Sequence, residues 1–192
     1  MDEEGFDYTG LHAFVFIDAV DPGANIRDVI DALRDYGPPP DGPVMFASEM
    51  VGRYLGFAHL RTESLAELQD LIAGQLWERG VHCSHCLEAG VATVGPRLQG
   101  AKRSTPEVIA LVRVRTEAGA LGSVLEAVAD PEGPLRDTFK GASAMFGDFD
   151  ILLQLGGDSF EAVAADAYGP LQTIEGIAAT DTAFTDARRY GD

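Results

Sequence analysis

The first half of the chain alternates between short apolar runs and a helical pattern of apolar residues. Residues 11–20 are rich in aromatic and β-branched side chains, which is typical of a strand. Residues 26–33 then place isoleucine, valine and leucine at the i, i+3, i+4, i+7 spacing of an amphipathic helix. Two further strands are predicted at 44–47 and 55–60.

The end of this half predicts one more helix and one more strand. Ser64-Leu65-Ala66-Glu67 is a capping box, which opens a helix, and Gly80 closes that helix. A strand follows from Val81. The residues expected to face inward from the helix are Leu65, Leu68, Leu71 and Ile72. The predicted order of elements is therefore βαββαβ.

The same pattern of landmarks starts again after residue 107. Gly147 follows Gly52 at an offset of 95, Phe149 follows Tyr54 at the same offset, and the helix stripe 121–128 repeats the stripe 26–33. Landmarks that recur in one order at one spacing indicate a tandem duplication. One departure is Gly169-Pro170, which should end or kink the last helix of the second half early.

A βαββαβ unit is typical of a ferredoxin-like fold, an α+β sandwich with its helices on one face of the sheet. We predict two tandem ferredoxin-like domains of the dimeric α/β-barrel type, at residues 1–93 and 107–192, with a linker at 94–106. The linker is placed where periodicity is lost among glycine, proline and basic residues. Pairing the two sheets face to face, within one chain or between chains, would cover their second apolar faces.

The charge of the chain bears on its partners. Thirty-one acidic residues against 14 basic ones give a formal net charge of −17. Because phosphate contacts need a basic surface, we expect no direct nucleic-acid binding. We also expect no membrane association, because apolar runs stay well below the ~18–20 residues that cross a bilayer. Since the acidic start at Met1–Glu4 is unlike a signal peptide, a cytoplasmic location is predicted.

A turn in the second half contains the most informative residues. Gly147-Asp148-Phe149-Asp150 leads into an almost wholly apolar strand, and a carboxylate at the start of such a strand needs a hydrogen-bond donor. Asp150 could bond the turn's own backbone amides, or it could also contact a ligand ammonium group. Thr180 and Thr182 alternate onto one face of the last strand and could add hydroxyl contacts. These six residues form the predicted ligand-binding site.

The second half resembles the effector-binding domain of the leucine-responsive regulator (Lrp/AsnC) family over about residues 107–187. The features that carry the likeness are the strand that leads into Gly119, the helix stripe, the turn 147–150 and the Gly176-Ile177 pair. In that family the aspartate turn lies near an effector pocket that commonly binds amino acids. The likeness therefore implies a small-molecule effector, such as an amino acid, near Asp150.

The first half resembles the same family more weakly, over about residues 10–92. It keeps Gly52 and Tyr54, but Leu55 stands where the family has its aspartate, which speaks against an effector site in this half. Only ten residues precede the first predicted strand, too few for the helix-turn-helix that the family places there. The likeness therefore implies a regulator without its own DNA-binding domain.

A cluster of histidines and cysteines occupies the predicted fourth strand. His82, Cys83, His85 and Cys86 include a C-x-x-C spacing of the kind found in zinc sites. Successive side chains of a strand point to opposite faces, so neither face gathers four ligands. We predict no metal site here and interpret these residues as buried thiols and hydrogen-bonded histidines, with metal binding or redox sensing as the alternative.

Together these patterns predict a non-enzymatic regulatory or sensor protein that binds a small molecule and needs no cofactor. The expected partners are the effector, further copies of the chain and a DNA-binding regulator. One alternative is an oligomerisation or partner-binding module without a ligand. The other is a small α/β-barrel enzyme, since such enzymes have site residues that no motif reveals.

The charge generates the first testable prediction. At physiological salt the pure chain should show no measurable binding to duplex DNA, because an excess of 17 negative charges opposes contact with phosphates. An electrophoretic mobility-shift titration checks this. A shift that weakens as salt is raised would show that the chain carries a local basic surface strong enough to bind DNA.

Overall fold

The computed structural model describes residues 11–17, 20, 23–38, 41–76, 87–92, 98–99, 106–146 and 148–186. In the first half the elements are β1 (Leu11–Ile17), α1 (Ile26–Arg34), β2 (Val44–Glu49), β3 (Gly56–Thr62), α2 (Leu65–Asp70) and β4 (Leu87–Ala92). In the second half they are β5 (Leu98–Gln99), β6 (Val108–Thr116), α3 (Leu121–Ala129), β7 (Phe139–Phe146), β8 (Ile151–Gly157), α4 (Phe160–Tyr168) and β9 (Ile177–Asp186).

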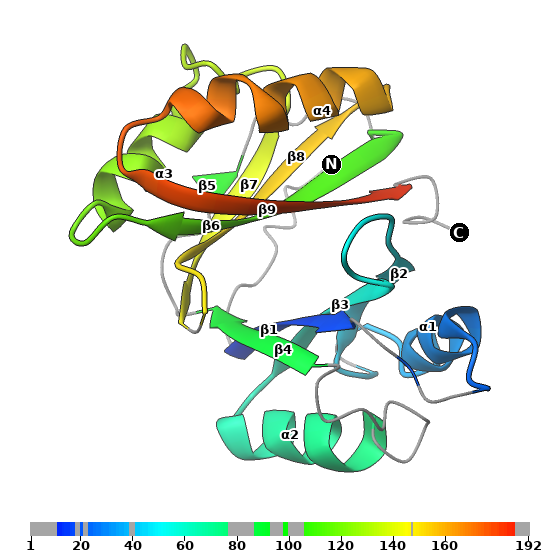
Figure 1. Cartoon of the computed structure of the whole chain (residues 1–192). Coiled ribbons are helices and arrows are strands. Elements are labelled where there is room, and N and C mark those ends of the chain that lie inside the picture. The colour runs from blue at the N-terminus through cyan, green and yellow to red at the C-terminus, as the bar shows by residue number, and fades with distance from the viewer. Residues whose placement is uncertain are drawn as a thin grey trace, which may run out of the picture.

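The strands form two antiparallel sheets that lie face to face, with helices on the outer sides (Figure 1). The first sheet has the order β2-β3-β1-β4 and the second the order β7-β8-β6-β9, while β5 also pairs with β7. Helices α1 and α2 lie against the first sheet, and α3 and α4 lie against the second. The predicted α+β class is confirmed.

The two sheets are joined along both edges. On one side β4 pairs with β7 through Val91–Phe146 and Ala92–Met145. On the other side Val51 pairs with Phe184 of β9, and their backbone hydrogen bonds measure 2.7 and 3.0 Å. The two sheets therefore close into a barrel with a shared interior.

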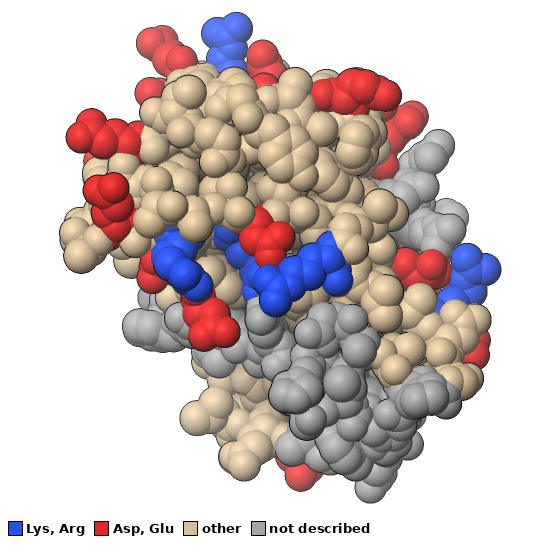
Figure 2. All heavy atoms as spheres, in the orientation of Figure 1, with Lys and Arg blue, Asp and Glu red and all other residues tan. Residues whose placement is uncertain are grey.

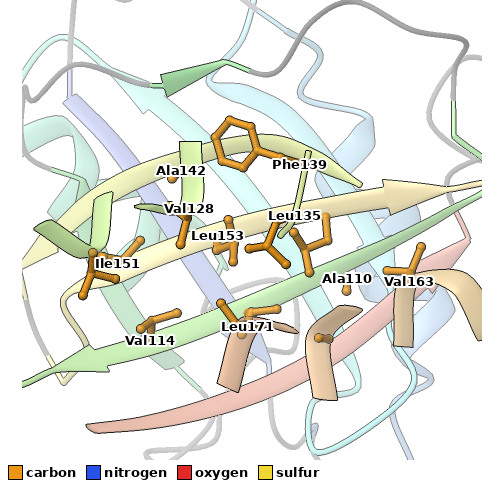
Figure 3. Close-up of a cluster of buried hydrophobic side chains, with 14 of the residues drawn as sticks. Ala110, Val114, Val128, Leu135, Phe139, Ala142, Ile151, Leu153, Val163 and Leu171 are labelled. Carbon is orange, nitrogen blue, oxygen red and sulfur yellow. The ribbon is translucent and has the colours of Figure 1, made fainter. Parts of the chain in front are cut away.

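Strand alternation divides the core into three layers. One apolar cluster lies between the first sheet and α1 and α2, and a second lies between the other sheet and α3 and α4 (Figure 3). The third cluster fills the space between the two sheets and contains Phe14, Phe16, Met50, Tyr54, Phe57, Ile109, Leu111, Met145, Phe149, Leu152 and Ala183. Both faces of each sheet are therefore buried, which explains why the strand sequences are so apolar.

Two helix predictions are confirmed, and the prediction that Leu65 faces the core is wrong. Val29, Ile30 and Leu33 are buried, as the stripe in α1 predicts. Helix α4 ends at Tyr168, immediately before Gly169-Pro170, and a 3₁₀ turn follows. Leu65 was expected to face inward but is 65% exposed. It is the first residue after the N-cap Ser64, and the contacts of this segment with the core are made further along, by Leu68 and Leu71.

Several predictions concern parts that the structure does not settle. His82, Cys83, His85 and Cys86 lie outside the described residues, so their role stays a prediction. The domain boundaries also stay a prediction, although the short strand β5 falls within the predicted linker 94–106. None of the described helices is long and apolar enough to cross a membrane.

A pair of buried hydroxyl groups helps to join the two halves. The Ser48 and Thr185 hydroxyls lie 2.7 Å apart, and the Thr185 hydroxyl also donates to the Glu49 carbonyl at 2.9 Å. Both side chains are almost fully buried. This hydrogen bonding lies beside the Val51–Phe184 bridge, so it fixes the end of β2 against β9.

The second prediction compares two threonines on β9. Thr185→Val removes a hydroxyl that bonds across the two halves and should lower the free energy of unfolding by about 1–3 kcal/mol. Thr182→Val is the matched control, because within the described part of the chain the buried Thr182 hydroxyl has no hydrogen-bond partner. That control should be neutral or slightly stabilising. Urea unfolding measures both variants, and equal effects would mean that the Ser48–Thr185 contact does not join the halves.

Candidate functional site

The alternation of side chains along β6 turns an arginine toward the barrel interior. Ala110, Val112 and Val114 pack toward the helices, whereas Ile109 and Leu111 pack between the sheets. Arg113 continues the inward row and is only 8% exposed. Burying a guanidinium group is costly unless it is paired and hydrogen-bonded. The surroundings of Arg113 are therefore the candidate functional site.

Arg113 is surrounded by aromatic rings and a carboxylate. Its guanidinium carbon lies 4.6 Å from the centre of the Tyr54 ring and 5.4 Å from the centres of the Phe16 and Phe149 rings. Its Nη2 donates to Asp181 Oδ2, and the register of β6 with β9 places these residues directly opposite one another. The charge is therefore stabilised by an ion pair and by cation–π contacts.

A cleft of about 310 Å³ opens beside this ion pair. Its lining comes from the turn before β3, from β6, from the turn between β7 and β8, and from β9. The lining residues are Arg53, Arg113, Arg115, Asp148, Phe149, Ala179, Thr180 and Asp181. Figure 2 shows basic side chains gathered around acidic ones across the middle of this face, below a largely uncharged surface.

The other two arginines are more exposed than Arg113. Arg53 Nη1 lies 3.5 Å from Asp181 Oδ2, the same oxygen that Arg113 contacts. Arg115 donates from Nε and Nη2 to the Asp148 carbonyl, at 3.3 and 3.0 Å. This carbonyl holds the Arg115 guanidinium over the turn that precedes β8.

The cleft carries a local excess of positive charge on a strongly acidic chain. Three arginines against two aspartates leave a formal charge of +1 in its lining, whereas the whole chain carries −17. Arginine presents a planar fork of donors that matches carboxylates and phosphates. The arrangement can therefore bind an anionic group or stabilise negative charge that develops on a bound molecule.

Only some of the predicted ligand-binding residues line the cleft. Asp148, Phe149 and Thr180 line the cleft. Gly147 lies outside the described residues. Thr182 is not among the residues that line the cleft, and Thr180 accepts a hydrogen bond from the Gln172 side chain at 2.9 Å. Ligand contact by any of these residues stays a prediction.

Asp150 has a structural contact that the sequence did not show. Its Oδ2 accepts hydrogen bonds from the Thr116 backbone amide at 2.7 Å and from the Thr116 hydroxyl at 3.1 Å. The donors therefore belong to the end of β6 rather than to the turn's own amides. Asp150 is not among the residues that line the cleft, although its neighbour Phe149 is.

Sequence reasoning missed Arg53, Arg113, Arg115 and Asp181. The signal for one of them was present, because Arg113 interrupts an otherwise apolar run from Val108 to Val114. The pairing of Arg113 with Asp181 depends on the register of two strands that are far apart in the chain. No local spacing reveals such a pair.

The described part of the chain also contains a pair of histidines. His12 Nδ1 and His59 Nε2 lie 2.8 Å apart, and His59 stacks against Phe14 with ring centres 4.5 Å apart. Among the described residues, no three histidines, cysteines or carboxylates are grouped so that they could hold a metal ion. Within that part of the chain, the pair is a hydrogen-bonded feature of the interior.

Comparisons with known proteins identify structural relatives only. No protein-family model matches the sequence, and no curated protein matches it. A chlorite dismutase from Candidatus Nitrospira defluvii in complex with imidazole is 12% identical, with a TM-score of 0.60 over 95% of this chain and 94% of that chain. An anthrone oxidase-like protein is 10% identical, with a TM-score of 0.59 over 97% and 95%. The siroheme decarboxylase NirDL is 10% identical, with a TM-score of 0.64 over 91% and 70%.

These findings overturn the predicted family and function. The neighbours are chlorite dismutase-like proteins with a dimeric α+β-barrel fold, a different family from the Lrp/AsnC effector-binding domains. The prediction of a non-enzymatic regulatory or sensor protein is wrong on the same ground, because the neighbours are named for enzymes. One of the features that suggested Lrp/AsnC has a structural role here, because Asp150 accepts hydrogen bonds from Thr116 at the end of β6. At about 10% identity the likeness shows the shared fold.

The third prediction concerns Asp150. Asp150→Asn keeps one acceptor oxygen for Thr116 but removes its charge, so the free energy of unfolding should fall by about 1 kcal/mol. Chemical denaturation measures this change. Because Asp150 is not in the cleft lining, ligand affinity should remain that of the parent chain. A loss of affinity without a loss of stability would instead establish the predicted ligand contact.

Proposed function

We propose that the chain is a small α+β-barrel enzyme whose substrate is a small organic molecule bound in the cleft between β6 and β9. The observation that carries this proposal is the buried Arg113, paired with Asp181 beside a cleft of about 310 Å³. Similarity to enzymes of the same fold supports catalysis rather than regulation. The barrel enzyme is therefore preferred among the alternatives that the sequence left open.

Stability alone is a poor reason to keep an ion pair in such a place. Desolvating two charges can cost more than their attraction returns, and apolar replacements of buried pairs are often neutral or stabilising. The Arg113 guanidinium lies among aromatic rings, where an apolar side chain would also pack well, whereas the Asp181 side chain is 34% exposed. Retention of the pair is best explained by a bound molecule that uses its charge.

The cleft supports substrate orientation and electrostatic stabilisation. Arg113 is held in place before any ligand arrives, by Asp181 and by the Tyr54 ring. A preorganised cation stabilises negative charge that develops during a reaction without having to reorganise. Phe149 supplies an apolar wall at the same cleft. The positive field of Arg113 would stabilise negative charge on the substrate, and the walls of the cleft would orient it.

An iron tetrapyrrole is one group that the neighbours' names suggest, and the described residues do not fit it. Haem iron is usually held by histidine, cysteine, methionine or tyrosine. The residues that line the cleft are arginine, aspartate, phenylalanine, alanine and threonine. His12 and His59, the histidines of the described ranges, are hydrogen-bonded to one another. No step of the proposed function passes through a haem.

Two finer proposals concern the architecture and its setting. We propose that the halves are two tandem ferredoxin-like domains, which is supported by the same βαββαβ order in β1–β4 and in β6–β9. In this arrangement one chain builds by itself the pair of facing sheets. Homo-oligomer formation, the lack of nucleic-acid contact and a cytoplasmic location stay predictions from the sequence.

The fourth prediction tests the cleft as the substrate site by filling it. Ala179 is exposed and lines the cleft, so Ala179→Trp should block it. Ala178 directly precedes Ala179 on β9 and is also exposed, but it is not among the lining residues. Ala178→Trp is therefore the matched control. A metabolite library is screened by thermal shift, where a ligand at 100 times its Kd adds about 2.7 kcal/mol of stability.

We expect every compound that stabilises the parent chain and is turned over by it to stabilise the Ala178→Trp variant equally. The Ala179→Trp variant should bind and convert none of them. Equal binding and turnover by both variants would place the substrate elsewhere and contradict the proposed function. A library that yields no stabilising compound would contradict it as well.

A further inference from the structure

We propose that the molecule bound in the cleft is a small monocarboxylate with a flat apolar body, and that Arg53 and Arg115 hold its carboxylate. Arg113 is assigned a different role, that of a positioning residue that stays on Asp181. The proposal rests on the proposed function and deepens it by naming the substrate class. It follows from how differently the three arginines are held.

Of the three arginines in the cleft lining, Arg113 is the one that is buried and paired with a carboxylate at short distance. Its side chain is 9% exposed, its Nη2 is bonded to Asp181, and the Tyr54 ring lies 4.6 Å from its guanidinium carbon. Leaving Asp181 for a ligand would separate the buried Arg113 guanidinium from its carboxylate partner, which is costly. Arg113 therefore fixes Asp181 and supplies a nearby positive field, without itself wrapping the ligand.

Arg53 lies near the same oxygen and also near the Tyr54 ring, whose centre is 5.4 Å from its guanidinium carbon. Its Nη1 lies 3.5 Å from Asp181 Oδ2, and its side chain is 59% exposed. Exposed ion pairs of this kind contribute little, because solvent screens them and side-chain entropy opposes them. Because Arg53 is exposed and lines the cleft, a ligand carboxylate that enters the cleft can reach its guanidinium group.

Arg115 approaches the cleft from the neighbouring position on the inward row of β6. It is exposed, and its Nε and Nη2 are bonded to the Asp148 carbonyl. Those two bonds orient the planar guanidinium without neutralising its charge. Arg53 and Arg115 both line the cleft and come from different elements, so together they form a clamp on an anion.

The charge of the lining limits the charge of the ligand. Three arginines minus two aspartates leave +1, which a single carboxylate neutralises. A dianion such as inorganic phosphate would bring an excess negative charge close to Asp148 and Asp181. Like charges at such short range repel one another, so this repulsion opposes a dianion more than a monoanion. The cleft therefore favours a monoanion.

The size and walls of the cleft limit the body of the ligand. A volume of about 310 Å³ is at the lower end of the range for small-molecule sites, roughly 300–1,000 Å³. Phe149 and Ala179 give one part of the lining an apolar surface. Because Phe149 is only 5% exposed, a small apolar group would contact Ala179 and the limited exposed part of Phe149 while its carboxylate reaches the arginines. Benzoate is the simplest probe with these properties.

The fifth prediction is tested by calorimetric titration of the full chain with benzoate, acetate and inorganic phosphate. Benzoate should bind with saturation, and it should bind more tightly than acetate or phosphate. Arg53→Gln and Arg115→Gln should each weaken benzoate binding about tenfold or more, which is the typical effect of losing a charge-assisted contact. Arg136→Gln is the matched control, because Arg136 is exposed, pairs with Asp137 and does not line the cleft.

Asp181→Asn separates the role of the lining charge from that of the clamp. It raises the charge of the lining by one, so phosphate binding should tighten more than benzoate binding. Circular dichroism checks that this variant is folded; if it is not, the two glutamine variants at exposed positions still decide the question. Folded Asp181→Asn with unchanged phosphate affinity would contradict the inference.

Two further outcomes overturn the inference. One is benzoate affinity that stays the same in Arg53→Gln and Arg115→Gln, which would mean that the clamp does not hold a carboxylate. The other is tighter binding of phosphate than of benzoate by the parent chain, which would mean a dianion site. If a neutral compound binds, and Ala179→Trp but not Ala178→Trp blocks it, the proposed function stands and this inference fails.

Discussion

The guanidinium group of Arg113, buried between two sheets, is the constraint on which the rest of the structure depends. It can be accommodated there only if a carboxylate meets it and aromatic rings surround it. Those groups come from both halves of the chain, with Tyr54 and Phe16 from the first and Phe149 and Asp181 from the second. The site therefore exists only when the two sheets face each other.

The contacts that close the barrel also help to form the cleft. The bridge from Val51 to Phe184, together with the contact between Ser48 and Thr185, fixes the end of β2 against β9. Arg53 follows Val51 by two residues, and Asp181 precedes Phe184 by three. The contacts that join the halves thus also bring Arg53 within reach of Asp181. Damage to the edge pairing would disturb the cleft as well as stability.

The periodicity of the sequence predicted most of the elements because local sequence determines them. Turn residues, capping residues and the helix stripes all act within a few positions, as at Ser64 and Gly169. Leu65 was misplaced because periodicity does not show where along its length a helix leaves the core. The exposed fraction of such a first-turn residue depends on tertiary packing.

The candidate site was predicted only in part, for the same physical reason. Asp148 and Phe149 lie in a recognisable turn, so the sequence pointed to them, and both line the cleft. Arg113 and Asp181 are joined by strand register over 68 positions of the chain, which no motif records. The family was misjudged because the turn before β8 serves the fold, through the bond from Thr116 to Asp150.

A crystal structure of the chain with benzoate tests the central claim most directly. The account predicts that the carboxylate lies within hydrogen-bond distance of Arg53 and Arg115, with the ring against Phe149. Arg113 should remain on Asp181, as it is without a ligand. Benzoate bound outside this cleft, or an Arg113 that leaves Asp181 to hold the carboxylate, would contradict the account.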